Sequence, residues 1–180
     1  MRTFIAVEIP EEVKKRIAEI GKDIKDLRRV ESKNMHVTVS FLGEIESVEC
    51  VGEVLKEVAK DFKPFNISAT GLGVFPNKNY IKVVWIGLEK GKVEIVEMSR
   101  RLKKILWERC GISAEEEDIP HITLARVKFL EENEKKNILR LLEENKDKIF
   151  GEWSVEKIFL KKSTLTPKGP VYETIEGVNL

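Results

Sequence analysis

The chain has 180 residues, 42% of them apolar, which is enough to bury a sizeable core and excludes a disordered polypeptide. Its 32 basic and 31 acidic side chains leave a net charge of +1. A charge so close to zero excludes the broad basic surface that binds long duplex nucleic acid, so any contact with nucleic acid must be local.

Strands and helices are predicted to alternate in the first half of the chain. Residues 3–9 are typical of a buried strand, and Pro10 opens a helix whose apolar positions step by three and four as far as Leu27. A strand over 35–42 follows, then a helix with one apolar stripe from Val48 to Phe62. Strands over 65–74 and 80–86 enclose a turn that contains Pro76.

The second half repeats this order. From strand 80–86 the chain continues into a helix over 92–109, a strand over 119–127 and a helix near 131–148, and strands over 154–160 and 171–175 close it. No linker rich in Gly, Ser or Pro separates the halves. We therefore expect an α+β fold in which residues 1–180 form one domain of two similar sheet-and-helix lobes, related by a pseudo-two-fold axis, with a central cleft.

Two features of the sequence bear on where the protein works. The apolar start is too short for a signal peptide and is interrupted by Glu8, and no stretch is long enough to cross a membrane. Cys50 and Cys110 show neither the spacing of a zinc site nor a dense disulfide framework. We expect both to be reduced thiols in a cytoplasmic monomer without membrane contact.

The two histidines of the chain lie in the same four-residue phrase, 85 positions apart. Side chains alternate along a strand, so in each phrase the histidine and the threonine two residues later project from one face, while apolar residues point into the core. The phrases are His36-Val37-Thr38-Val39 and His121-Ile122-Thr123-Leu124. If the lobes are related as expected, the two phrases form opposite walls of the cleft.

Two imidazoles and two hydroxyls without further ligands indicate acid and base catalysis. Metal sites built on histidine usually need Cys, Asp or Glu ligands at recognisable spacings, which neither phrase supplies. Ser40 shares the face of His36, but the strained turn of a serine nucleophile is missing around it. An unperturbed imidazole pKa near 6.5 lets one histidine be neutral and the other protonated near pH 7, and threonine hydroxyls can donate to phosphate oxygens.

The doubled H-x-T-x phrase resembles the signature of the 2H phosphoesterases. Over nearly its whole length the chain is similar to the RNA 2′,3′-cyclic phosphodiesterases of the LigT type, also called 2′-5′ RNA ligases. The resemblance is carried by RTFIAVEIP, HVTVSFLGE, GVFPN, VVWIGL, PHITLARV and KKSTLTPKGPVYE.

This resemblance implies a two-lobed LigT-like fold and an activity on RNA ends. The reaction would open a terminal 2′,3′-cyclic phosphate to a 2′-phosphomonoester without metal or other cofactor, and its reverse would join tRNA halves through a 2′-5′ linkage. The resemblance also implies that His36 protonates the departing 3′ oxygen and that His121 activates water. Thr38 and Thr123 would then hold the phosphate oxygens.

Arg126 is the expected further phosphate ligand, because the family places an arginine here and guanidinium offers a planar fork of donors. It lies five residues after His121, an odd offset that turns it away from the cleft unless the strand ends or bulges. A surface salt bridge is the alternative. Phe41 occupies the equivalent place after His36, and we expect it in the core rather than as a platform for a base.

Other side chains are expected around the cleft or in solvent. Aromatic rings stack on splayed bases and lysines follow a short single-stranded backbone. Phe75 and Tyr80 flank a predicted turn, and Lys161, Lys162, Lys168 and Tyr172 lie in the last predicted hairpin. The acidic run from Glu115 to Asp118 is expected to be a solvated loop.

Two other functions stay open at this point. The same chemistry could act on a small cyclic nucleotide, an ADP-ribose cyclic phosphate or a 2′-5′ linked oligonucleotide. A non-catalytic module that binds nucleotide or RNA is the third reading, which the paired histidines and threonines disfavour because binding needs no acid and base. A series of substrates of increasing length separates these readings.

Overall fold

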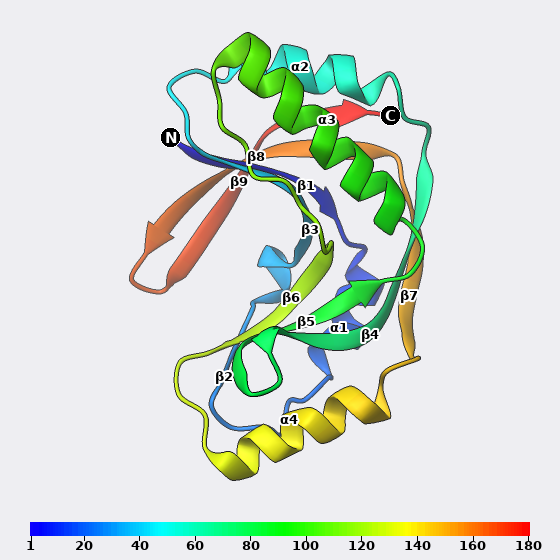
Figure 1. Ribbon diagram of the computed structural model, residues 1–180, viewed down its shortest axis with the longest axis vertical. Coiled ribbons are helices and arrows are strands. Elements are labelled where there is room, and N and C mark those ends of the chain that lie inside the picture. Colours follow the sequence, from blue (N-terminus) through cyan, green and yellow to red (C-terminus); the bar gives the residue numbers. More distant parts are fainter.

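The computed structural model describes residues 1–180 and contains one nine-stranded antiparallel sheet and four α-helices (Figure 1). The strands are β1 (Arg2–Glu8), β2 (Leu27–Arg29), β3 (His36–Glu44), β4 (Phe65–Asn77), β5 (Tyr80–Leu88), β6 (His121–Val127), β7 (Ile149–Val155), β8 (Lys157–Thr166) and β9 (Gly169–Asn179). The helices are α1 (Glu11–Ala18), α2 (Glu49–Ala59), α3 (Lys92–Cys110) and α4 (Glu132–Glu144), and a short 3-10 helix spans Ser32–Asn34. The expected α+β class is confirmed.

The two histidine phrases lie on the two central strands of the sheet. The strand order is β7-β4-β5-β6-β3-β1-β8-β9, and the short β2 pairs with β6. A single residue pair, Val37 with Ile122, joins β3 to β6, and each of these residues directly follows a histidine. The outer neighbour of β3 is β1, and the outer neighbour of β6 is β5. In each case the neighbour is the strand that precedes the histidine strand in the chain, with a helix between them. This matching order is what a two-fold relation between the halves requires.

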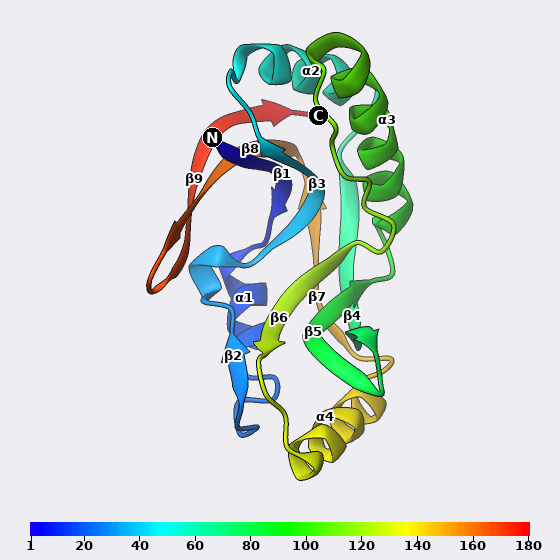
Figure 2. The same ribbon diagram turned by 60° about the vertical axis from the view of Figure 1, so that its left-hand side comes forward.

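The helices connect the halves to each other. α2 and α3 pack together at one end of the molecule, and α1 and α4 lie toward the other (Figures 1 and 2). α1 follows β1 yet packs on β7, whereas α3 follows β5 yet packs on β3, so each helix contacts the half that its own strand does not belong to. The buried apolar side chains accordingly form one contiguous cluster, with Ile5, Leu55 and Ile122 fully buried.

The first helix is shorter than its apolar periodicity predicts. α1 ends at Ala18, and Gly21 takes a positive φ of 62° that turns the chain away. The Arg29 guanidinium donates to the carbonyl of Ala18 at 2.9 Å and to that of Ile20 at 2.5 Å, which satisfies acceptors exposed beyond the last helical turn. Ile20 lies beyond the end of the helix but is buried. Its apolar side chain therefore continues the helical spacing in the sequence, which is why the predicted helix is too long.

The strand predicted over 154–160 is in fact parts of two strands. β7 ends at Val155 and β8 begins at Lys157, so the chain changes partners at Glu156. β7 pairs with β4, whereas β8 pairs with β1 and β9. The β8–β9 hairpin extends beyond the sheet and projects from the body of the molecule (Figures 1 and 2).

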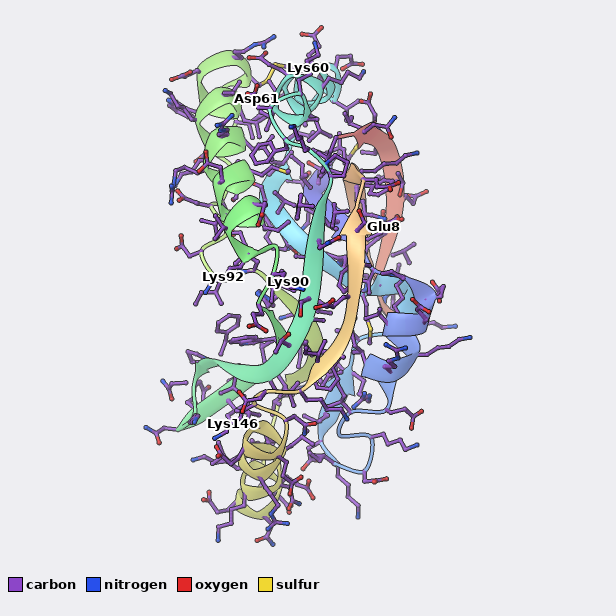
Figure 3. All side chains as sticks on the ribbon, turned by 90° about the vertical axis from the view of Figure 1, so that its right-hand side faces the viewer. Glu8, Lys60, Asp61, Lys90, Lys92 and Lys146 are labelled. Carbon is purple, nitrogen blue, oxygen red and sulfur yellow. A yellow bond between two sulfur atoms is a disulfide. The ribbon has the colours of Figure 1, made fainter.

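Cys50 and Cys110 form a disulfide, which contradicts the expected reduced thiols. Cys50 lies near the start of α2 and Cys110 at the end of α3, and the packing of these helices brings the two Cα atoms to 6.0 Å. Asp61 lies just beyond the other end of α2 (Figure 3). Its carboxylate accepts a hydrogen bond from Arg101 of α3 at 2.9 Å. Neither cysteine's sequence neighbours indicate this partner, 60 residues away.

Candidate active site

One cavity of about 220 Å³ receives both histidine phrases. His36 and Thr38 of β3 line it together with His121 and Thr123 of β6. The apolar residues between and after them are buried in the core, as strand alternation predicts. The structure therefore brings together the four residues that the sequence singled out, on neighbouring strands at the centre of the sheet.

A β-bulge in β6 turns Arg126 into the same cavity. Trp85 of β5 pairs with Thr123 and Val84 with Ala125, which leaves Leu124 as an extra residue. The extra residue reverses the alternation, so that a side chain five residues after His121 lies on the histidine's face. Arg126 lines the cavity, as expected for a bulged strand.

β3 contains the matching bulge, and the expected core position of Phe41 is wrong. Ile5 of β1 pairs with Ser40 and Ala6 with Thr38, so Val39 is the extra residue. Phe41 is thereby turned out of the core, is 39% exposed and lines the cavity. The two strands thus present an aromatic ring and a guanidinium at equivalent positions.

The His36 imidazole has a fixed orientation. Its Nδ1 lies 2.8 Å from the carbonyl oxygen of Asn34, which can only accept, so Nδ1 carries a proton. Its Nε2 lies 3.1 Å from the hydroxyl of Thr38, which donates to Nε2 when the ring is neutral. Burial, together with the smaller effects of the positive charges of Lys161 and His121, lowers the pKa of His36 to about 4.

The His121 imidazole is anchored in the same way. Its Nδ1 donates to the carbonyl oxygen of Ile119 at 2.7 Å, again two residues upstream. The ring of Phe75 meets it edge-on at 5.0 Å. Burial and then the charge of Arg126 lower the pKa of His121. Burial therefore favours the neutral form of both imidazoles in the unliganded protein.

Glu117 supports the loop that holds His121, a role the sequence did not indicate. Its carboxylate accepts a hydrogen bond from the Ile119 N–H at 3.2 Å, and its own N–H donates to the buried hydroxyl of Ser99 at 2.8 Å. Burial, with a smaller effect of the charges of Asp118 and Glu115, raises the pKa of Glu117 to about 7. The expectation of a solvated acidic run is therefore wrong at Glu117.

The cavity carries more positive than negative charge. Arg28, Arg126 and Lys168 line it, and none of the three has a carboxylate within 4.0 Å. Glu31, an acidic residue of the lining, forms an ion pair with Lys33 at 2.9 Å. Such a surplus favours an anionic ligand.

The remaining expected cleft residues divide into two groups. Lys168 and Tyr172 of the β8–β9 hairpin line the cavity. Lys161 instead pairs with Glu8 at 2.9 Å, and Lys162 lies 3.8 Å from a carboxylate oxygen of Glu173.

Tyr80 and Ser40 lie outside the cavity lining. Tyr80 is exposed at the β4–β5 turn. The hydroxyl of Ser40 is buried and donates to the carbonyl of Glu115 at 2.7 Å, so Ser40 has a structural role.

The arrangement is suited to proton transfer on an anion. Two imidazoles, each held through Nδ1 by a backbone carbonyl, line a cavity that also offers hydroxyl and guanidinium donors. No group of three or more His, Cys, Asp or Glu side chains is placed to hold a metal ion, and no helix is long and apolar enough to span a membrane.

Comparison with known proteins gives consistent matches. Residues 6–180 match the model of a family described as the AKAP7 2′5′ RNA ligase-like domain. The chain is 40% identical to the RNA 2′,3′-cyclic phosphodiesterase of Methanocaldococcus jannaschii, over 98% of this chain and 99% of that one.

Solved structures match the fold over the whole chain. A Thermus thermophilus protein is 28% identical with a TM-score of 0.81, over 100% of this chain and 98% of that one. E. coli LigT, solved in complex with 3′-AMP, is 20% identical with a TM-score of 0.73, over 99% of this chain and 97% of that one.

Proposed function

Because the chain belongs to the RNA 2′,3′-cyclic phosphodiesterase family of the 2H phosphoesterases, we propose that it hydrolyses the 2′,3′-cyclic phosphate at an RNA end. The product is a 2′-phosphomonoester beside a free 3′ hydroxyl. The observation that carries this proposal is the convergence of both His-Thr phrases, with Arg126, on one cavity.

The reaction is an in-line displacement at phosphorus. A water oxygen forms a bond to phosphorus, and the bond from phosphorus to the 3′ oxygen breaks. His121 accepts a proton from the water at its bare Nε2, and His36 delivers a proton from Nε2 to the departing oxygen. Both histidines are held in the same way through Nδ1, so their hydrogen bonds do not distinguish the acid from the base. The assignment of the two roles therefore follows the family pattern.

Substrate binding favours the protonated form that His36 needs, with the proton taken up from solvent. Its pKa of about 4 in the unliganded protein leaves it neutral, but an anionic phosphodiester beside the ring stabilises imidazolium and raises the pKa. Protonated Nε2 no longer accepts from the Thr38 hydroxyl, which lies 3.1 Å away. That hydroxyl is then free to donate to a phosphate oxygen, so proton uptake and phosphate binding favour each other.

Thr123 and Arg126 complete the binding of the phosphate. Thr123 shares the cavity face of His121 and donates to a non-bridging oxygen. Arg126 reaches the same cavity through the bulge at Leu124 and has no competing carboxylate. Its charge balances the negative charge that builds on the phosphoryl oxygens during displacement.

The same displacement joins two RNA ends when a 5′ hydroxyl takes the place of water. The 5′ oxygen forms a bond to phosphorus and the bond from phosphorus to the 3′ oxygen breaks, which leaves a 2′-5′ linkage without consumption of ATP. This ligation, on tRNA halves, is part of the proposal. The proposal includes a cytoplasmic location. The Cys50–Cys110 disulfide does not contradict this location, because intracellular proteins of hyperthermophiles also contain disulfides.

Phosphorus NMR of product formation tests the proposed hydrolysis. EDTA-treated protein, His36→Ala and His121→Ala are each mixed with a short RNA that ends in a 2′,3′-cyclic phosphate. The parent is expected to yield a 2′-phosphate and both variants to lose at least a hundredfold in rate. No conversion by folded parent contradicts the RNA hydrolase, and a 3′-phosphate product contradicts the assigned leaving oxygen. Conversion of ADP-ribose cyclic phosphate alone would favour the small-nucleotide alternative.

A further inference from the structure

Arg28 and Arg126 stand opposite each other on paired strands. Arg28 of β2 is the register partner of Arg126 of β6. Directly opposite residues of an antiparallel pair project from the same face with Cβ atoms about 5 Å apart. Both side chains line the cavity of the two histidines, so two guanidinium groups face one space.

Neither guanidinium is neutralised within the protein. Arg28 and Arg126 make no side-chain hydrogen bond and no ion pair, in contrast to Arg29, whose guanidinium donates to two backbone carbonyls. Glu31, the nearby acidic lining residue, is engaged by Lys33. Like charges placed opposite each other on a sheet destabilise the fold, so this pair is best explained by an anion that it binds.

The proposed reaction identifies this anion. Arg126 lies on the strand of His121 and Thr123 and serves the cyclic phosphate, so Arg28 lies one strand further from the reacting atoms. An RNA that ends in a 2′,3′-cyclic phosphate continues only through the 5′ side of its last nucleotide. The next anion along this chain is therefore the phosphodiester on that side.

We propose that Arg28 binds the phosphodiester on the 5′ side of the terminal nucleotide, which makes an oligonucleotide of at least two residues the preferred substrate. This inference rests on the proposed function. Remote binding of this kind raises catalytic efficiency because the binding energy helps to position the terminal phosphate. A mononucleotide 2′,3′-cyclic phosphate lacks the phosphodiester and cannot use Arg28.

Kinetics on matched substrates test the subsite. The measured quantity is the ratio of kcat/KM for a diadenylate that ends in a 2′,3′-cyclic phosphate to kcat/KM for adenosine 2′,3′-cyclic phosphate. Arg28→Gln is expected to lower this ratio by roughly tenfold, and Arg28→Lys by less, since lysine keeps the charge without the fork. Arg140→Gln, which removes an exposed, unpaired arginine of α4, is the matched control and is expected to keep the parent's ratio. An unchanged ratio in Arg28→Gln overturns the proposal.

A binding measurement separates failure of the subsite from failure of the proposed function. Calorimetric titration with diadenylate 2′-phosphate and with adenosine 2′-phosphate needs no turnover. Arg28→Gln should weaken binding of the dinucleotide more than that of the mononucleotide, and should lower the salt dependence for the dinucleotide by roughly 0.7 in log–log slope. If parent protein hydrolyses neither substrate, the hydrolase fails; if the titrations also show no difference between the two ligands, the subsite fails as well.

Discussion

Val39 and Leu124 occupy equivalent places in their strands, since each is the extra residue of a β-bulge three positions after a histidine. The bulge shifts the following side chains to the other face. Phe41 and Arg126, five residues after the histidines, therefore enter the cavity instead of the core. The same bulge in both strands therefore adds the aromatic ring of Phe41 on β3 and the guanidinium of Arg126 on β6 to the two His-Thr pairs of the site.

Replacement of Arg126 should slow the reaction more than it weakens binding of the ground state. Arg126→Gln removes the charge while keeping a hydrogen-bond donor, and we expect kcat to fall by about a hundredfold because negative charge on the phosphoryl oxygens is greatest in the transition state. Arg126→Lys should recover part of this loss. Steady-state kinetics measure both variants, and a loss confined to KM would mean that Arg126 only attracts the substrate.

The pH profiles of kcat and of kcat/KM should lie in different ranges. The profile of kcat/KM reports the unliganded enzyme, in which burial lowers the pKa of His36 to about 4 and also lowers that of His121. The fraction with one protonated imidazole therefore falls as the pH rises through the mildly acidic range.

The profile of kcat reports the enzyme with bound substrate. The phosphodiester anion favours imidazolium and raises both pKa values, so we expect a bell displaced by roughly one pH unit or more to higher pH. Stopped assays between pH 4 and 9 measure both profiles, the range being roughly that over which imidazoles titrate. Coincident profiles would contradict coupling between phosphate binding and protonation, and a kcat that changes monotonically would contradict paired catalysis.

The central part of the site was predictable because it depends on strand alternation alone. Histidine and threonine two residues apart share a face in any strand, so the faces of His36 and Thr38, and of His121 and Thr123, follow from spacing. The bulges do not follow from spacing, since Val39 and Leu124 are ordinary apolar strand residues. For this reason the sequence did not predict that Phe41 faces the cavity.

Other parts depend on contacts between distant segments. Arg28 lies in a strand of three residues whose partner is Arg126, nearly a hundred positions later, so no local pattern could mark it. Ile20 continues the apolar spacing of α1 although the helix has already ended. Glu117 resembles its acidic neighbours in sequence, and only the folded loop places its carboxylate on the N–H of Ile119.

Glu117 should make stability depend on pH in the neutral range. Its folded pKa of about 7 lies above the ordinary glutamate value of 4.5, so the folded protein binds more protons than the unfolded chain between these values. The free energy of unfolding should therefore fall as the pH rises from 4.5 to 7 and then level off. We expect a decrease of about 1 kcal/mol, because partial solvent exposure screens the effect.

Two variants separate the charge of Glu117 from its hydrogen bond. Glu117→Gln keeps an oxygen acceptor for the Ile119 N–H but cannot ionise, so denaturant unfolding should show a smaller decline between pH 5 and 7, roughly the titration range of this carboxyl. Glu117→Ala loses the acceptor, and its kcat should fall several-fold because the carbonyl that orients His121 is less firmly held. Equal kcat values for the two variants would contradict the positioning role.

The disulfide between Cys50 and Cys110 should stabilise the fold without taking part in catalysis. It closes a segment of 60 residues, and a loop of this length restricts the unfolded chain by about 4 kcal/mol in the chain-entropy account. The double variant Cys50→Ser, Cys110→Ser should lose about 3–4 kcal/mol of unfolding free energy in guanidinium titrations. Its kcat should match that of the parent, because neither cysteine lines the cavity. Parent protein treated with dithiothreitol should show the same loss, whereas the double variant should not respond. Two titratable thiols in untreated, denatured parent protein would contradict the bond.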